Sequence, residues 1–374
     1  MLPKLYDEFS TTGRDFGRQY LGTINHCTKC QITEVRNGAY TLSLETTVND
    51  DCANLITSQK IIGVKPNPFD AIQYFEITKT ERTTDGKIKA DATHVKNLAF
   101  QICTTGDQDY EGNIYVYNGT PTAVWNKLKD DYIPTTIPFH FTTDINTAKD
   151  FSLGMSIPES LGNILGGKAG SFLDVWGGEY HWNNYHIQLL SARGETKPYQ
   201  IRYGKNVSDA TQTETCESAY THVLPYGKVS LGNRKINFYA QPVAIAESQS
   251  IYTKVFMLEC TSFLDAYEVG QHGYHYEEVR AAMQTYAANY ARLNDLGKLS
   301  VSISVTLRAE LDEMAEIGLC DTVHIILDNF GTQAYAKITE VTYDALLERW
   351  DKIQIGTPKI TLADLIINKE RYIR

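Results

Sequence analysis

The sequence predicts a β-rich α+β protein built from several domains. Its 374 residues exceed what one hydrophobic core usually organises. Its 24 tyrosines accompany frequent Thr, Val and Ile, which favour strands. Period-two alternation of apolar and polar residues recurs along the chain and is typical of half-buried strands. We therefore expect roughly two to four domains in which strands outnumber helices.

Residues 1–103 are predicted to form a first β-barrel or sandwich. Strand-like runs in this stretch are separated by two turn sequences that contain glycine, Asn37-Gly38 and Thr83 to Gly86. Asn-Gly is a two-residue turn whose backbone matches the twist of paired strands. A hairpin centred on Asn37 is therefore expected.

The middle of the chain mixes helix and strand signals. Thr120-Pro121 predicts the start of a short helix, because Thr is a favoured N-cap and Pro a favoured first helical residue. A longer helix is predicted for residues 276–296, where apolar side chains recur at helical spacing and Gly297 supplies the stop.

The segment from Val305 to Gly356 is the most informative part of the chain. Thr322 to Leu327 alternates as a strand does, Asp328 to Gly331 supplies turn residues, and Arg349 to Ile355 forms a last strand-like run. The run between them carries apolar residues on both faces, which a closed barrel would explain. The segment is predicted to be a β-meander.

Four segments of the chain resemble, in order, the prophage tail endopeptidase family, the tail-associated hub proteins of phages that infect Gram-positive bacteria. The segments are CQITEVRNGAYTLSLET from Cys30, IIGVKPNPFDAIQYFEITKTERTTDGKIKADATHV from Ile61, SFLDVWGGEYHWNNYHIQLLSARG from Ser171 with the following IRYGKN, and the meander. The resemblance spans nearly the whole chain.

This resemblance implies two barrel domains related to the tail tube protein and an inserted α/β outer domain. Mapped onto this chain, the first barrel is 1–103 and the second is 215–240 with 300–357. The outer domain is 104–214 with 241–299, and 358–374 is a C-terminal extension.

The function implied by the resemblance is that of a structural hub at the tip or baseplate of a virion tail. Three copies would place six barrels around a channel for DNA and the tape measure protein. The expected partners are further copies of the chain, the tail tube and distal tail proteins, and a central spike, fibre or separate lysin. In related proteins the enzyme that cuts peptidoglycan is appended after the hub. Because this chain ends shortly after Gly356, we expect no enzyme and no cofactor.

Composition excludes several other classes of protein. The net charge of −10 disfavours sequence-specific nucleic-acid binding, which requires clustered Lys and Arg. An acidic balance suits a channel that DNA passes without sticking, although ordinary solubility explains the same charge. No apolar run is long enough for a transmembrane helix, and the N-terminus lacks the pattern of a signal peptide. We expect synthesis in the host cytoplasm.

Two clusters keep a catalytic alternative open. His272, His275 and Glu278 have the chemistry of a zinc site and would suit a peptidoglycan endopeptidase, although acidic residues at a helix start also complement its dipole. Glu179 and His181, with His186 nearby, would share one face of a strand and allow acid–base chemistry. Exposed Trp and Tyr in the middle domain leave a carbohydrate-binding adhesin as a third possibility.

The seven cysteines form no regular framework and are expected to be reduced. Cys27 and Cys30 make a CxxC sequence, which invites a metal or redox interpretation. We predict no metal there, because residues three apart in a strand point to opposite faces and no second CxxC completes a tetrahedral site.

Contacts between copies are predicted at two places. One is the hairpin tip of Asp328, Asn329 and Phe330, and the other is the predicted helix with Tyr286 and Tyr290. In a ring of identical copies each contact joins two different surfaces.

Overall fold

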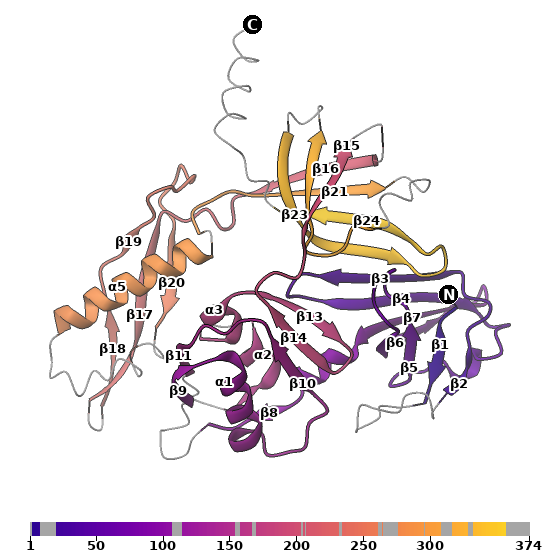
Figure 1. The fold of residues 1–374 in the computed structure, drawn as a ribbon, viewed down its shortest axis with the longest axis horizontal. Coiled ribbons are helices and arrows are strands. Elements are labelled where there is room, and N and C mark those ends of the chain that lie inside the picture. Colours follow the sequence, from indigo (N-terminus) through magenta and orange to yellow (C-terminus); the bar gives the residue numbers. More distant parts are fainter. Residues whose placement is uncertain are drawn as a thin grey trace, which may run out of the picture.

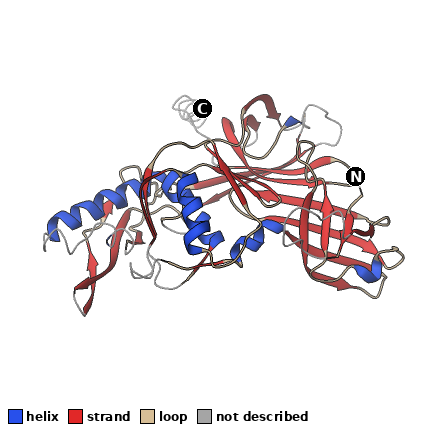
Figure 2. Ribbon diagram, turned by 60° about the horizontal axis from the view of Figure 1, so that its bottom comes forward, coloured by secondary structure: helices blue, strands red, loops and turns tan. Residues whose placement is uncertain are grey.

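A computed structural model describes residues 2–7, 20–106, 114–153, 158–166, 170–202, 205, 207–231, 234–260, 264, 276–294, 296–307, 316–327 and 332–356 of the chain. They form a long sheet, an inserted unit of small sheets and helices, and an arm of one sheet and one helix (Figure 1). Figure 2 shows that the longer helices lie in the arm and the inserted unit, whereas the long sheet consists of strands. The β-rich α+β class predicted from the sequence is confirmed.

The first half of the long sheet comes from the N-terminal residues. Its strands are β1 (Lys4–Tyr6), β2 (Tyr20–Thr23), β3 (Lys29–Val35), β4 (Tyr40–Thr47), β5 (Ile61–Val64), β6 (Gln73–Arg82) and β7 (Lys87–His94), with the 3-10 helix η2 (Ala53–Leu55) after β4. They pair antiparallel in the order β3–β4–β7–β6–β5–β1–β2. Asn37, with a φ of 53°, makes the predicted turn between β3 and β4.

The second half of the long sheet comes from two separate stretches of chain. Its strands are β15 (Thr196–Arg202), β16 (Val207–Thr215), β21 (Ser300–Leu307), β22 (Thr322–Leu327), β23 (Thr332–Asp344) and β24 (Arg349–Ile355). The order is β16–β21–β24–β23, and β22 pairs with both β23 and β15. The predicted strands Thr322–Leu327 and Arg349–Ile355 are confirmed. The predicted turn at Asp328 to Gly331 lies outside the described residues.

The residues expected to complete this second half differ from those observed. Residues 215–240 were expected to belong to one barrel with residues 300–357, but β17 and β18 form a separate sheet. Instead β16 pairs along its length with β21, from Val207 opposite Leu307 to Thr215 opposite Ser300. Val207 is buried in the core of the sheet and Ala210 packs against that core. Most of β16 is polar and exposed, so apolar alternation did not indicate that it would take this place.

A bulge explains why β23 is apolar on both faces. Ala336 and Ile338 are buried in one phase of the strand, and Val341 and Tyr343 are buried in the opposite phase. The register shifts between Ile338 and Glu340, which adds a residue and turns the following side chains over. A closed barrel is therefore not needed to account for this pattern.

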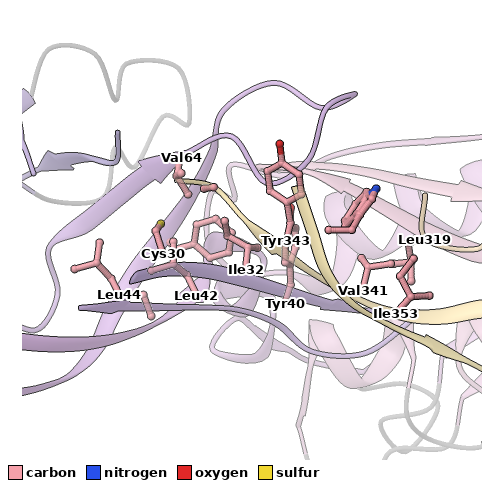
Figure 3. Packing of buried hydrophobic residues seen from close by; sticks show 14 of the residues in the cluster. Cys30, Ile32, Tyr40, Leu42, Leu44, Val64, Leu319, Val341, Tyr343 and Ile353 are labelled. Carbon is pink, nitrogen blue, oxygen red and sulfur yellow. The ribbon is translucent and has the colours of Figure 1, made fainter. Parts of the chain in front are cut away.

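The two halves join directly into one thirteen-stranded sheet, because β23 pairs with β3. Tyr343 lies opposite Ile32 at this seam. A single hydrophobic cluster continues across it, with Ile32, Leu42 and Leu44 on one side and Val341, Tyr343 and Ile353 on the other (Figure 3). The seam is thus part of the core and not a surface contact between independent domains.

The inserted unit packs beneath the first half of the sheet and has its own core. Its elements are η3 (Val95–Phe100), β8 (Cys103–Thr104), β9 (Ile114–Gly119), α1 (Pro121–Lys127), η5 (Leu128–Tyr132), β10 (His140–Thr143), β11 (Lys149–Leu153), β12 (Glu159–Ser160), α2 (Leu161–Leu165), α3 (Phe172–Trp176), β13 (Glu179–Asn183) and β14 (His186–Leu190). The core is aromatic: Phe172 contacts Phe141, Phe151 and Trp176. The helix start at Thr120-Pro121 is confirmed, since the Thr120 side chain accepts a hydrogen bond from the amide of Ala123.

The arm is a second, separate core, made by β17 (His222–Leu231), β18 (Arg234–Tyr239), β19 (Val243–Ala244), β20 (Val255–Glu259) and α5 (Tyr276–Leu293). Buried Val279, Met283 and Ala287 of α5 pack with Val223 and Leu258 of the sheet. The helix predicted at 276–296 is confirmed, ending a few residues earlier. The single outer domain expected from 104–214 and 241–299 is instead two clusters, because β17 and β18 supply the sheet that α5 needs to cover its apolar face.

Candidate functional site

One face of the long sheet is lined by hydroxyl groups. Thr342, Thr33, Thr41 and Thr93 lie opposite one another on four neighbouring strands, β23, β3, β4 and β7. Their neighbours along each strand point into the core, so the threonines face outward. The Oγ1 atoms of Thr33 and Thr342 are 3.1 Å apart and hydrogen-bonded across the seam. We call this surface the hydroxyl face.

A shallow hollow of about 300 Å³ lies on the hydroxyl face. Its lining is mostly uncharged and polar, and consists of Gln31, Thr33, Thr41, Leu42, Ser43, Thr78, Asp91, Ala92 and Thr93. The Nε2 atom of Gln31 donates to Asp351 Oδ2 at 2.9 Å, which ties this surface to β24. No histidine, cysteine or cationic side chain lines the hollow. Such a surface hydrates well and offers no cluster of positive charge to hold phosphate.

A buried ion pair connects the inserted unit to the long sheet. Arg193 follows β14, and its two terminal nitrogens donate to the Glu34 carboxylate at 2.6 and 3.0 Å. The two side chains are only 11% and 7% exposed. Burial disfavours the charged guanidinium, but the charge and hydrogen bonds of Glu34 outweigh this and raise the pKa of Arg193. A bidentate pair of this kind fixes orientation as well as position.

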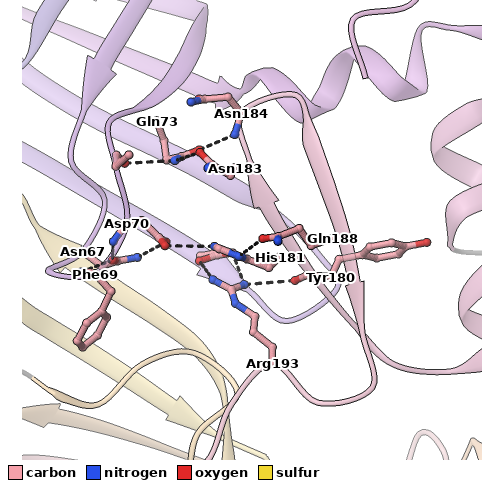
Figure 4. A network of polar contacts seen from close by, with 12 residues as sticks. Asn67, Phe69, Asp70, Gln73, Tyr180, His181, Asn183, Asn184, Gln188 and Arg193 are labelled. Atoms are coloured by element: carbon pink, nitrogen blue, oxygen red, sulfur yellow. Dashed lines mark hydrogen bonds and ion pairs between the residues drawn. The ribbon is translucent and has the colours of Figure 1, made fainter. Parts of the chain in front are cut away.

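A second set of polar contacts holds the β13–β14 hairpin against the loop before β6 (Figure 4). The Nε2 atom of His181 lies 3.2 Å from Asp70 Oδ1, and its Nδ1 atom lies 2.7 Å from Gln188 Oε1. Asn67 braces the loop by donating to Asp70 Oδ2 at 2.7 Å. Burial would raise the pKa of Asp70, but the contact with His181 outweighs it, and the net pKa is lowered.

The candidate acid–base pair of Glu179 and His181, which the sequence left open as an alternative, does not form. Glu179 is buried and accepts from Lys337 Nζ at 2.7 Å and from the Arg193 amide at 2.8 Å, with Arg36 Nε 3.3 Å away. His186 is hydrogen-bonded to Thr142 at 2.8 Å. Because each group is occupied by a different structural partner, these contacts act as a junction between the hairpin and the sheet.

The other predicted site residues are placed only in part. Glu278 is exposed in the first turn of α5, whereas His272 and His275 lie outside the described residues. Within the described parts of the chain, no group of three His, Cys, Asp or Glu side chains is arranged to hold a metal ion.

Of the residues predicted to form contacts between copies, only some lie in the described parts of the chain. Asp328, Asn329 and Phe330 lie outside the described residues. Tyr286 and Tyr290 are half-buried and pack against the arm's own core, where Tyr290 stacks on Phe256 with ring centroids 5.9 Å apart. Burial raises the pKa of both tyrosines.

The arm carries an uncovered apolar face that was not predicted from the sequence. Tyr226 lies opposite Tyr239 on the side of the sheet away from α5, and Val255 and Met257 lie on the same side. Tyr239 and Met257 are 63% and 69% exposed. The signal was present in Val255 to Leu258, four successive apolar residues, a run typical of a strand covered on both faces. We call the surface made by Tyr226, Tyr239, Val255 and Met257 the arm face.

The fold and these surfaces define a β-rich protein with a polar sheet face, an uncovered arm and structural ion pairs. Residues 195–366 match the model of the prophage endopeptidase tail family. The predicted resemblance to a phage tail family is thus confirmed.

Solved structures of similar fold include three tail proteins, two of them from prophages. Prophage tail protein gp18 from Listeria monocytogenes EGD-e has a TM-score of 0.58 and 12% identity, and the match covers 99% of each chain. The 43 kDa tail protein of prophage MuSo2 from Shewanella oneidensis has a TM-score of 0.55 and 11% identity, covering 95% of this chain and 98% of its own. The tail protein from Neisseria meningitidis MC58 has a TM-score of 0.53 and 9% identity, covering 95% and 96%.

No curated protein matches the sequence. Among the helices that the structure describes, none has the length and apolar character needed to cross a membrane.

Proposed function

We propose that this protein is a non-enzymatic structural hub at the tip or baseplate of a phage or phage-derived tail. Three copies form a ring that joins the tail tube to a central spike, fibre or lysin. The observation that carries this proposal is the continuous thirteen-stranded sheet with its hydroxyl face, in a chain whose fold is that of prophage tail proteins. The two halves of the sheet are the units that would take the places of two tube-like barrels.

The hydroxyl face is the part of the molecule best suited to line a channel. Its threonines, serine and glutamine bond to water, and the carboxylates of Asp91 and Asp351 repel phosphate. The chain as a whole carries a net charge of −10, which works in the same direction. DNA and the tape measure protein would therefore pass this surface without binding to it.

The arm face supports contact between copies. From the exposed fractions of its four side chains, it presents about 400 Å² of apolar surface, taking roughly 200 Å² for each large side chain. Patches of this size on single chains are often functional. One partner in a standard interface contributes about 800 Å², so the arm face would form the apolar centre of such a contact. We propose that a second copy covers it, because ring closure buries the same face in every copy.

The mass of the purified chain in solution tests the trimer and the arm face together. We expect a trimer that Met257→Glu dissociates, because a carboxylate would then be buried in an apolar contact. Leu347→Glu is the matched control, since Leu347 is similarly exposed at 58% but lies in the β23–β24 turn. If both variants remain trimeric, the arm face is not the contact. A strict monomer at high concentration, with no ring in the assembled tail, would refute the hub itself.

A zymogram on peptidoglycan tests the absence of enzymatic function. We expect no clearing, with or without a metal chelator. Clearing that the chelator abolishes would favour a hydrolase instead and would direct attention to Glu278 and its neighbours.

A further inference from the structure

We propose that a cavity between the inserted unit and the β3–β4 turn binds a small aromatic carboxylate, whose charge pairs with Lys96. The cavity has a volume of about 230 Å³. An apolar cavity of about 150 Å³ holds benzene, so this one has room for an aromatic ring with a short acidic group. The site shares no residue with the arm face or with the hollow on the hydroxyl face, so it is independent of the hub proposal.

Aromatic and aliphatic side chains form much of the cavity wall. Tyr180 and Trp182 of β13 are buried there, as is Leu165 of α2. Phe100, at the end of η3, also lines the cavity and is 53% exposed. A Cβ on Gly162 would lie 2.4 Å from the Phe100 ring, so this glycine leaves room for the ring to lie against α2. Aromatic rings attract one another beyond the area that they bury, so the wall favours an aromatic ligand.

Hydrogen bonds hold three parts of this wall together. The Asn37 Oδ1 atom accepts from the Tyr180 amide at 2.8 Å, and the Asn37 Nδ2 atom donates to the Gly178 carbonyl at 3.0 Å. The Tyr180 hydroxyl donates to the Leu165 carbonyl at 2.9 Å. The β3–β4 turn, β13 and α2 are therefore fixed relative to one another. A ligand that enters a preformed site loses less free energy to the ordering of the protein.

The ammonium group of Lys96 lies at the wall of the cavity. Among the described residues that line the cavity, Lys96 is the only one that carries a charge, and it is 7% exposed. Its Nζ atom donates to the Gly38 carbonyl and lies 5.5 Å from the centroid of the Trp182 ring. Both partners also line the cavity. An ammonium has three N–H donors, so it can hold a carboxylate in addition to the Gly38 carbonyl.

The protein carboxylate that acts on Lys96 is already engaged. Glu34 favours the charged form of Lys96, but its carboxylate forms the bidentate pair with Arg193, whose own charge disfavours that form. The neighbouring His94 is kept neutral, because burial and the charge of Lys96 lower its pKa. Burial has the largest effect on Lys96 and lowers its pKa to about 8. A buried charge costs less when it is paired, so a carboxylate ligand would supply the partner that this ammonium lacks.

Ligand-observed NMR on the full chain tests the site with phenylacetate and with phenylacetamide, its neutral isostere. For phenylacetate at pH 7 we expect a Kd on the order of 1 mM, as its size implies. Phenylacetamide should bind about tenfold more weakly, because a hydrogen bond to a charged group is stronger than one between neutral groups. Between pH 7 and 9 Lys96 loses most of its charge, so the preference for phenylacetate should fall about tenfold, towards equality.

Three variants separate charge from shape. Lys96→Met removes the charge from a side chain of similar length and should bind phenylacetate and phenylacetamide about equally. Lys79→Met changes an exposed lysine outside the cavity and should keep the preference of the natural chain. Ala39→Trp enlarges an exposed residue of the cavity wall and should weaken the binding of both ligands. Circular dichroism verifies that each variant is folded.

Several results would overturn the proposal. One is the absence of phenylacetate binding to the natural chain at several times the expected Kd. A second is equal binding of phenylacetate and phenylacetamide to the natural chain at pH 7. A third is a Lys96→Met variant that keeps the preference, and a fourth is an Ala39→Trp variant that binds both ligands as the natural chain does. None of these results depends on whether the chain forms a trimer.

Discussion

Replacing Glu34 with glutamine removes the negative charge beside Arg193 while leaving the shape of the side chain almost unchanged. The guanidinium stays in a site where it is 11% exposed and loses the carboxylate that balances its charge. Removing one partner of a buried ion pair costs about 3 to 5 kcal/mol. Because the glutamine oxygen still accepts one hydrogen bond, we expect the lower end, about 3 kcal/mol.

Urea unfolding followed by tryptophan fluorescence measures this loss of unfolding free energy. Trp182 is a suitable reporter because it lies on β13, the strand whose Tyr180 carbonyl accepts a hydrogen bond from Arg193. The double variant Glu34→Met with Arg193→Met should recover most of the stability, because no uncompensated charge remains. Lys79→Met is the control, which breaks the exposed ion pair of Lys79 and Glu81 and should leave the midpoint unchanged. The reasoning is refuted if Glu34→Gln behaves like this control, or if the double variant is no more stable than Glu34→Gln.

Three further predictions concern the same junctions. Burial lowers the pKa of Lys96 from 10.5 to about 8. Between these pH values the unfolded chain holds more protons than the folded chain, so stability rises with pH. Relative to Lys96→Met, the free energy of unfolding of the natural chain should therefore rise by about 1 kcal/mol from pH 7 to 9. Gly194→Ala places its Cβ 2.2 Å from the Cys320 backbone and should cost about 3 kcal/mol or more in thermal unfolding, whereas Gly177→Ala, with open space and a φ of 73°, should cost about 1. Asn184→Gly keeps the left-handed turn but loses two hydrogen bonds to the backbone of the first sheet half, which should cost about 2 kcal/mol and speed hydrogen exchange in β13 and β14.

Each of these outcomes has a result that contradicts it. A stability difference between the natural chain and Lys96→Met that stays flat or falls with pH would mean that the folded protein holds this proton as firmly as the unfolded chain does. Equal losses for Gly194→Ala and Gly177→Ala would remove the steric argument. Unchanged exchange in Asn184→Gly would show that the hairpin does not depend on its tip.

Local elements were predictable because their signals are local. Alternation placed the strands at Thr322–Leu327 and Arg349–Ile355 at the bounds observed, and Thr120-Pro121 marked a helix start through capping chemistry. The Asn37 turn was likewise fixed by a residue type that tolerates positive φ. In each case the residues that specify the structure are also the residues that form it.

Pairings and contacts across the chain were not predictable in this way. The sequence carried no sign that β16 would lie beside β21, because its residues are almost all polar and exposed and lack the apolar alternation of a half-buried strand. The Arg193–Glu34 pair joins residues 159 positions apart, and no spacing rule links them. The arm face had a signal in β20, but only the position of α5 reveals which side remains open.

The sequence by itself determined the class of elements, the bounds of a few of them and the resemblance to a phage tail family, because propensity, periodicity and turn chemistry act within a few residues. Only the tertiary structure decided that β3 and β23 join two halves into one sheet, and that one face of the arm is left uncovered. These features depend on which surfaces pack together and exclude water. The hydrophobic effect is non-directional, so the local pattern shows that a residue is buried but not which distant surface covers it.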